Sequence, residues 1–169
     1  WASAARADAP TSATSTNLRS VAVLMLVAAV VMTPSFVMGV PPLDSAPYVF
    51  SWTRQLADAF GHGEVYPRWL PGSFEGLGSP TFYLYAPIAL FLAGALNAPG
   101  LSTSLAVNIA AFIMLLASGL TMRAWLQALR ARSVLGACLY MAAPYHQMDL
   151  YGRVDLAEFG ASVWLPLLA

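Results

Sequence analysis

The sequence contains no lysine, a single cysteine and very few charged residues. Charged side chains occupy 9% of the 169 positions, whereas soluble domains average roughly 25%. Eight arginines balance eight acids, so no basic surface is available to bind nucleic acid. Cys138 by itself excludes an internal disulfide and a site built from several thiolates. With only two histidines besides, we expect no structural zinc site and predict no metal ligands.

Apolar residues are abundant instead. They make up 59% of the chain, and the mean hydropathy is +0.65. A chain of this length cannot bury so much apolar surface inside a globule, because small domains leave a large share of their surface exposed. A soluble enzyme, a disordered region and a nucleic-acid-binding domain are therefore poor interpretations. The composition predicts an all-α protein of the membrane.

The positions of the charges divide the chain into segments. Residues 20–43 and 76–122 carry no charge, and a membrane-spanning helix needs about 20 mostly apolar residues. We predict four spans, which are residues 21–40, 101–122, 133–147 and 156–169. A cleaved signal peptide is the competing interpretation of the first run, but the run continues past Pro34 without a small-residue cleavage site.

Both ends of the chain suggest a polytopic protein that continues further. The first residue is Trp1, and the last predicted span stops before it is complete, so we expect the N-terminal fragment of a longer protein. Residues 1–19 are predicted to form a disordered cytoplasmic tail, because they are rich in Ala, Ser and Thr and have no apolar period. Residues 20–169 would form the membrane domain.

A proline-broken apolar segment, residues 81–96, decides the topology. Arginines at 6 and 19 precede the first span, and a second group (Arg123, Arg130, Arg132) follows the 101–122 span. Arginine-rich loops face the cytoplasm, and both groups do so only if 81–96 lies in the membrane interface. Residues 47–60, an amphipathic run with aromatics, form the other predicted interfacial helix. The N-terminus is then cytoplasmic, and 41–100 and 144–158 are external.

The candidate site residues lie in these two external segments. Asp44 directly follows the first span, where it either ends the helix or serves as a catalytic carboxylate at the membrane face. Arg68 is either an interfacial anchor or a phosphate ligand, because guanidinium suits bidentate phosphate contact. Arg153 has acids at 149 and 158 as alternative partners. Such acids beside an apolar span are costly unless paired or facing a polar cavity, so either a structural ion pair or a shared cleft is expected.

Three motifs resemble a known family. Residues 63–71 (GEVYPRWLP), 76–87 (GLGSPTFYLYAP) and 143–159 (APYHQMDLYGRVDLAEF) are similar to bacterial membrane proteins labelled 6-pyruvoyl-tetrahydropterin synthase-related. These proteins in turn resemble the type-C (GT-C) glycosyltransferase superfamily. The resemblance covers about residues 20–169. It implies a polytopic enzyme that takes a sugar from a polyprenyl-phosphate-linked donor.

The resemblance also implies roles for individual residues. Asp44 matches the essential acid that follows the first span, whereas Tyr48 stands where many relatives have a histidine. Asp44 would act as general base toward an acceptor hydroxyl, or it would help to hold a divalent cation. The sequence identifies no other cofactor. The catalytic prediction is Asp44 and Glu158. The substrate-binding prediction is Tyr48, Arg68, His146, Arg153 and Asp155.

Two other functions remain open. Charges near the bilayer also mark transport paths, so the protein could be a transporter or flippase of lipid-linked precursors. It could also be a non-catalytic scaffold of a membrane complex. In each case we expect a multi-pass protein of the inner membrane that contacts lipid, and in the first a polyprenyl-phosphate sugar donor as partner.

Overall fold

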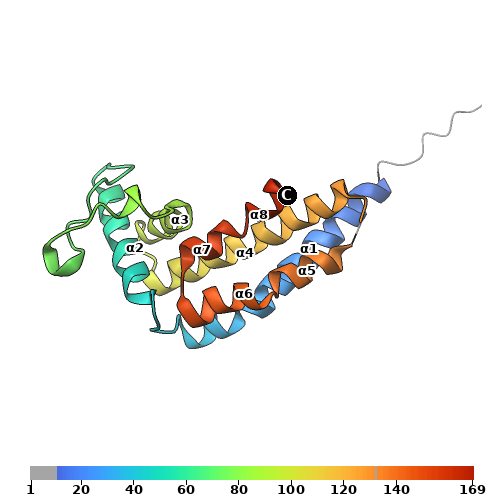
Figure 1. Cartoon of the computed structure of the whole chain (residues 1–169). Coiled ribbons are helices and arrows are strands. Elements are labelled where there is room, and N and C mark those ends of the chain that lie inside the picture. Colours follow the sequence, from blue (N-terminus) through green and yellow to red (C-terminus); the bar gives the residue numbers. More distant parts are fainter. Residues whose placement is uncertain (1–10, 132) are drawn as a thin grey trace, which may run out of the picture.

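The computed structural model describes residues 11–131 and 133–169 (Figure 1). Every regular element in this part of the chain is a helix, apart from one β-bridge between Leu70 and Ser79, which confirms the all-α prediction. The predicted disordered tail is wrong for residues 11–19, because α1 begins at Thr11. Its remaining residues, 1–10, lie outside the described part, as does Arg132 of the second arginine group.

Two long helices, α1 (Thr11–Met38) and α4 (Thr103–Ala128), pack against each other and form the body of the molecule (Figure 1). Ser102 begins α4 cleanly, because its side-chain oxygen accepts a hydrogen bond from the Leu105 N–H. By length and composition, α4 and the 22-residue apolar part of α1 could each cross a membrane. Much of their apolar surface faces outward, since 22% of this stretch of α1 and 44% of that of α4 is buried.

The last two predicted spans are not continuous helices. Residues 133–147 form α5 (Val134–Met141) and α6 (Pro144–Gln147), and residues 156–169 form α7 (Leu156–Ala161) and α8 (Leu165–Leu168). Pro144 explains the first break, because the residue before a proline avoids the helical region, and Ala143 has an extended backbone. The eight residues of α5 rise only about 12 Å, against about 30 Å of hydrocarbon.

The two predicted interfacial helices differ in how far they form. Residues 47–60 lie within a helix, α2 (Ala46–Gly61). Residues 81–96 are helical only in part: a short turn, η2 (Thr81–Tyr83), is followed by non-helical chain, and α3 (Ile88–Asn97) begins after Pro87. Their position in the membrane interface stays a prediction. Ten residues of α3 rise about 15 Å, which is half of a span. A further turn, η1 (Phe74–Gly76), lies between α2 and η2.

The two ends of the long helices carry different groups. At one end, the Arg123 guanidinium donates a hydrogen bond to Asn17 Oδ1 at 2.7 Å, so the start of α1 lies beside the end of α4. At the other end, the Ser45 N–H donates to the Arg153 carbonyl at 2.9 Å. The segments predicted to be external therefore meet at one end, and the α1 and α4 arginines lie at the opposite end.

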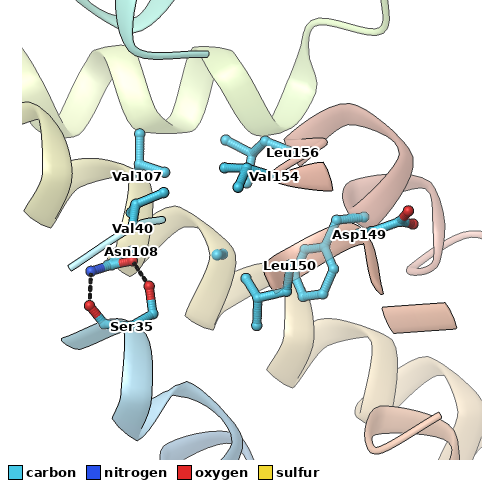
Figure 2. Close-up of a pocket in the computed structure, with 10 residues that line it drawn as sticks. Ser35, Val40, Val107, Asn108, Asp149, Leu150, Val154 and Leu156 are labelled. Carbon is cyan, nitrogen blue, oxygen red and sulfur yellow. Dashed lines mark hydrogen bonds between the residues drawn. The ribbon is translucent and has the colours of Figure 1, made fainter. Parts of the chain in front are cut away.

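A buried polar pair joins α1 to α4 near the end where these segments meet. The Ser35 hydroxyl donates to Asn108 Oδ1 at 2.6 Å, and Asn108 Nδ2 donates to the Ser35 carbonyl at 3.0 Å (Figure 2). That carbonyl is one of the last four of α1, which have no partner within the helix. One turn earlier, the Tyr151 hydroxyl donates to the Val31 carbonyl. These bonds join α1 to α4 and to the 148–153 segment.

Candidate functional site

Arg153 lies among four carboxylates, and we call these five residues the Arg153 cluster. Its Nε is 3.9 Å from Asp44, and its Nη2 is 3.6 Å from Asp155. Its Nη1 is 3.3 Å from Asp149 and also contacts Glu158. One guanidinium balances only one of the four acids. The cluster therefore carries a negative excess when its acids are ionised.

Irregular backbone brings these side chains together. A π-helical turn, η3 (Met148–Arg153), ends at Val154, whose left-handed φ of 54° is unfavourable for a β-branched residue. Such a conformation costs about 1–3 kcal/mol and is common at functional sites. It turns the chain so that the Asp155 N–H donates to the Asp149 carbonyl at 2.9 Å.

Asp155 also starts the next helix. Its Oδ1 accepts hydrogen bonds from the Ala157 and Glu158 N–H groups, each at 3.1 Å, which makes it the N-cap of α7. Capping fixes Asp155 and places Glu158 in the first turn of the same helix. Arg153 can therefore reach both carboxylates at once.

Asp44 approaches from the other side of the cluster. It lies in the turn between α1 and α2 with a left-handed φ of 39°. Its side chain is 61% exposed, and its only contact in the cluster is the one with Arg153. Asp44 is consequently the acid with the greatest freedom to meet another molecule.

Two tyrosines hold the acids of the cluster. The Tyr85 hydroxyl donates to Asp155 Oδ1 at 2.8 Å, and the Tyr145 hydroxyl donates to Glu158 Oε2 at 3.2 Å. Burial, together with the hydrogen bond and charge of Asp155, raises the pKa of Tyr85, so Tyr85 remains a donor throughout the physiological range. Tyr48 lies further out and connects to Tyr85 through the rings of Trp52, at centroid distances of 5.8 and 5.0 Å.

Asp149 has the most unusual environment of the four acids. Its side chain is 1% exposed, and its Oδ2 has no hydrogen-bond partner among the described residues. Burial raises the pKa of Asp149 to about 6, with a further increase from Glu158 and an opposing effect from Arg153. The hydrogen bond to Glu158 raises the pKa of Arg153, so the guanidinium stays charged. Asp149 therefore changes charge at about pH 6.

A small cavity lies beneath the cluster, between α1, α4 and the 149–159 segment. Its volume is about 10 Å³, enough for roughly one water molecule. Figure 2 shows the carboxylate of Asp149 directed away from Ser35 and Asn108 on the far side of this cavity. The cavity is too small for a substrate, so any ligand of the cluster binds on its exposed side.

Not every predicted site residue joins the cluster. The structure brings together Asp44, Arg153, Asp155 and Glu158. Arg68 is exposed and makes no hydrogen bond or ion pair with any residue that the structure describes. Its role as a phosphate ligand stays a prediction.

His146 has a different position again. It is 4% exposed and packs against the rings of Tyr140 and Phe159, at 4.8 and 5.9 Å. Its two ring nitrogens have no partner within the described residues. It is therefore a core residue here, with no surface to offer a substrate.

The sequence did not single out three members of the site. Asp149 was considered only as a structural partner of Arg153, although its spacing of four residues was the available signal. Tyr85 and Tyr145 gave no signal, because their partners lie 70 and 13 residues away. Their roles follow from the tertiary fold.

A divalent cation does not fit the cluster as it is built. All four carboxylates lie within 4 Å of the Arg153 guanidinium, which occupies the position that a cation would need. Among residues 11–131 and 133–169, no group of three or more His, Cys, Asp or Glu could hold a metal ion. The chemistry of the site is therefore derived from its side chains.

Comparisons with protein-family models, with curated proteins and with solved structures gave no match to this chain. The family resemblance thus rests on the three motifs themselves. The inferences that follow start from the geometry of the site.

Proposed function

We propose that the protein is a membrane glycosyltransferase of the GT-C type that uses a polyprenyl-phosphate-linked sugar. The observation that carries the proposal is the meeting of Asp44 with Arg153. These residues are 109 positions apart in the sequence and lie 3.9 Å from each other at one end of the two long apolar helices. Ionised carboxylates accept hydrogen bonds from sugar hydroxyls, and a guanidinium binds phosphate.

The proposal places α1 and α4 across the inner membrane. Their outward-facing apolar side chains would contact lipid. The arginines at the far end (Arg19, Arg123, Arg130) would face the cytoplasm, together with the N-terminus. The Arg153 cluster would then lie at the external surface, where a lipid-linked donor presents its phosphate and sugar. The shorter helices α5, α7 and α8 would pack beside α4 in this membrane domain.

The cluster offers one way to perform the transfer. The donor phosphate displaces Asp44, the most exposed acid, from Arg153. Asp44 then removes the proton of an acceptor hydroxyl, whose oxygen attacks the anomeric carbon of the sugar. The bond between that carbon and the phosphate oxygen breaks, and its electron pair leaves with the polyprenyl phosphate. Arg153 stabilises this charge, while Glu158, fixed by Arg153 and Tyr145, orients a sugar hydroxyl.

The test is sugar transfer by the protein in lipid nanodiscs. Asp44→Asn keeps the shape of the side chain but removes its basicity, so transfer from a polyprenyl-phosphate sugar should fall by about 100-fold or more. Glu75→Gln is the matched control, because Glu75 is an exposed acid on η1 outside the cluster, and its activity should equal the wild type.

Mass analysis of the products separates the rival functions. A new sugar-acceptor product supports transfer. Donor that crosses the bilayer chemically unchanged indicates a transporter or flippase instead. Undiminished transfer by a folded Asp44→Asn variant would remove Asp44 from the mechanism.

A further inference from the structure

A second hollow lies between α2 and residues 64–71, on a different part of the molecule from the Arg153 cluster. Its volume is about 240 Å³. It is lined by Gln55 and Asp58 of α2, by His62, which follows the end of that helix, and by Glu64 and Trp69 of the next segment. We call this hollow the α2 groove.

Several bonds hold the wall of the α2 groove in place. The Glu64 N–H donates to the Ala59 carbonyl at 2.9 Å. The Gly72 N–H donates to Gln55 Oε1 at 2.8 Å. Leu70 exchanges two backbone hydrogen bonds with Ser79, at 2.9 and 3.1 Å. The groove is therefore preformed, and little ordering is required when a ligand binds.

Two carboxylates in the groove have no partner among the described residues. The carboxylates of Asp58 and Glu64 make no hydrogen bond or ion pair with the described residues. Arg54, which lies four residues before Asp58, donates to Thr103 Oγ1 at 3.3 Å instead. His62 Nδ1 lies 2.7 Å from the Asp58 carbonyl. Because a carbonyl only accepts, Nδ1 carries a proton, and in the neutral ring Nε2 is then an acceptor.

Trp69 supplies an aromatic surface beside these acceptors. Its side chain packs so tightly on Gly78 that a Cβ there would lie 2.1 Å from the indole Nε1. Gly78 has a φ of +80°, which glycine adopts at little cost. Glycine therefore lets the indole lie on the backbone, and 54% of Trp69 remains exposed. The negative face of an aromatic ring attracts C–H groups.

We propose that the α2 groove binds an uncharged saccharide. Its hydroxyls donate to Asp58, Glu64 and the free nitrogen of His62, and its C–H face rests on Trp69. No lysine or arginine lines the groove, so two carboxylates would repel a phosphate. The ligand is thus of a different class from the lipid-linked donor at the Arg153 cluster. This inference rests on the groove alone and does not require the proposed function.

Ligand binding is measured by saturation-transfer NMR on the protein in nanodiscs. Maltose is the uncharged probe, and glucose 1-phosphate and glucosamine are its charged comparators. Maltose should receive saturation, whereas glucose 1-phosphate should receive little. The double variant Asp58→Asn with Glu64→Gln should weaken maltose binding about tenfold or more, since hydrogen bonds to charged groups are the strong ones. Trp69→Ala should weaken it as well, and Glu75→Gln should bind as the wild type.

Three results would overturn the proposal. The first is that maltose receives no saturation. The others are that the folded double variant binds maltose as tightly as the wild type, and that the protein prefers glucose 1-phosphate to maltose. Saturation of glucosamine alone would assign the groove to a cationic amino sugar and reject an uncharged saccharide. If Trp69→Ala fails to fold, the double variant alone tests the proposal. Asp58 and Glu64 are exposed, so the unfolding temperature of the double variant should match that of the wild type. The assay involves no sugar transfer, so its failure leaves the glycosyltransferase proposal untouched.

Discussion

The four carboxylates around Arg153 differ mainly in how much water reaches them. The side chains of Asp149 and Asp155 are 1% and 9% exposed, whereas those of Glu158 and Asp44 are 45% and 61% exposed. Hydrogen bonds also hold the two buried acids in place. The Asp149 carbonyl accepts from the Asp155 N–H, and the Asp155 side chain caps α7. We infer that they hold Arg153 in place, and that the two exposed acids meet the substrate.

Asp149 gives a prediction about pH. Its pKa of about 6 lies above the ordinary value of 3.8, so the folded protein binds this proton more tightly than the unfolded chain. The resulting stabilisation is complete below about pH 4 and is lost as the pH rises to 6. At about 1.36 kcal/mol for each pKa unit, the loss is about 3 kcal/mol. The free energy of unfolding, measured in micelles from pH 4 to 8, should record it.

Asp149→Asn is the matched variant for this measurement. An amide does not titrate, so the difference in unfolding free energy between wild type and variant should change between pH 4 and 6 and stay constant above pH 7. Acids outside the Arg153 cluster contribute equally to both proteins and cancel. A difference that is flat across the whole range would contradict the elevated pKa.

The sequence was informative about which side chains carry charge and less so about their contacts. Asp44, Arg153 and Glu158 stand out because each lies beside an apolar run. The burial of His146 between two aromatic rings follows from packing, which residue type does not reveal. Arg68 sits in a motif that suggested phosphate binding, yet the backbone around it places the side chain in solvent. Proximity between distant segments depends on the fold.

At the scale of elements, the Ser35–Asn108 pair fixes α1 against α4. Asn108→Leu leaves both the hydroxyl and the carbonyl of Ser35 without their partner, which should cost about 2 kcal/mol. Ser35→Ala should cost about half of this, because Asn108 still donates to the main chain at position 35. Unfolding of both variants in mixed micelles measures the difference. Equal costs would show that the carbonyl bond contributes little.

The close packing of α2 on α3 depends on a glycine. A Cβ at Gly94 would lie 2.6 Å from the Cβ of Leu56, and a Cβ cannot move without its backbone. Gly94→Ala should therefore destabilise the protein by about 2 kcal/mol. Gly61→Ala, on the same helix pair but with no atom within 4 Å, should be neutral or slightly stabilising. Thermal unfolding of the two variants compares them, and equal melting temperatures would contradict the predicted contact.

The long charge-free runs correctly predicted the two long helices. The shorter predicted spans were less accurate, because a proline interrupts the helix in 133–147. Most of each run is helical: residues 21–38 lie within α1 and residues 103–122 within α4. Pro34 lies inside α1 without ending it. Hydropathy alone also favoured 133–147, but Pro144 forces an extended residue before it. The π-helical turn from Met148 and the left-handed Val154 have no sequence signal, because bulky residues rarely adopt such a backbone.

At the scale of the whole molecule, the antiparallel arrangement of α1 and α4 predicts opposite accessibility of the two ends. In a Cys138→Ala background, Glu75→Cys should react with a membrane-impermeant maleimide in intact cells. Arg130→Cys should react only after the membrane is permeabilised, because it follows α4 at the arginine-rich end. Reaction of both from the same side would contradict the proposal that α4 crosses the bilayer.

The unequal depth of the acids around Arg153 has a consequence for ionic strength. Dissolved salt shortens the range of electrostatic attraction from about 30 Å at 0.01 M to about 3 Å at 1 M, but it acts only where ions can enter. Asp44 would be screened from Arg153 long before Asp149, which water hardly touches. High salt should therefore weaken the contact between Asp44 and Arg153 while the contact between Asp149 and Arg153 persists. The turn that bears Asp44 would be the first part of the site to move.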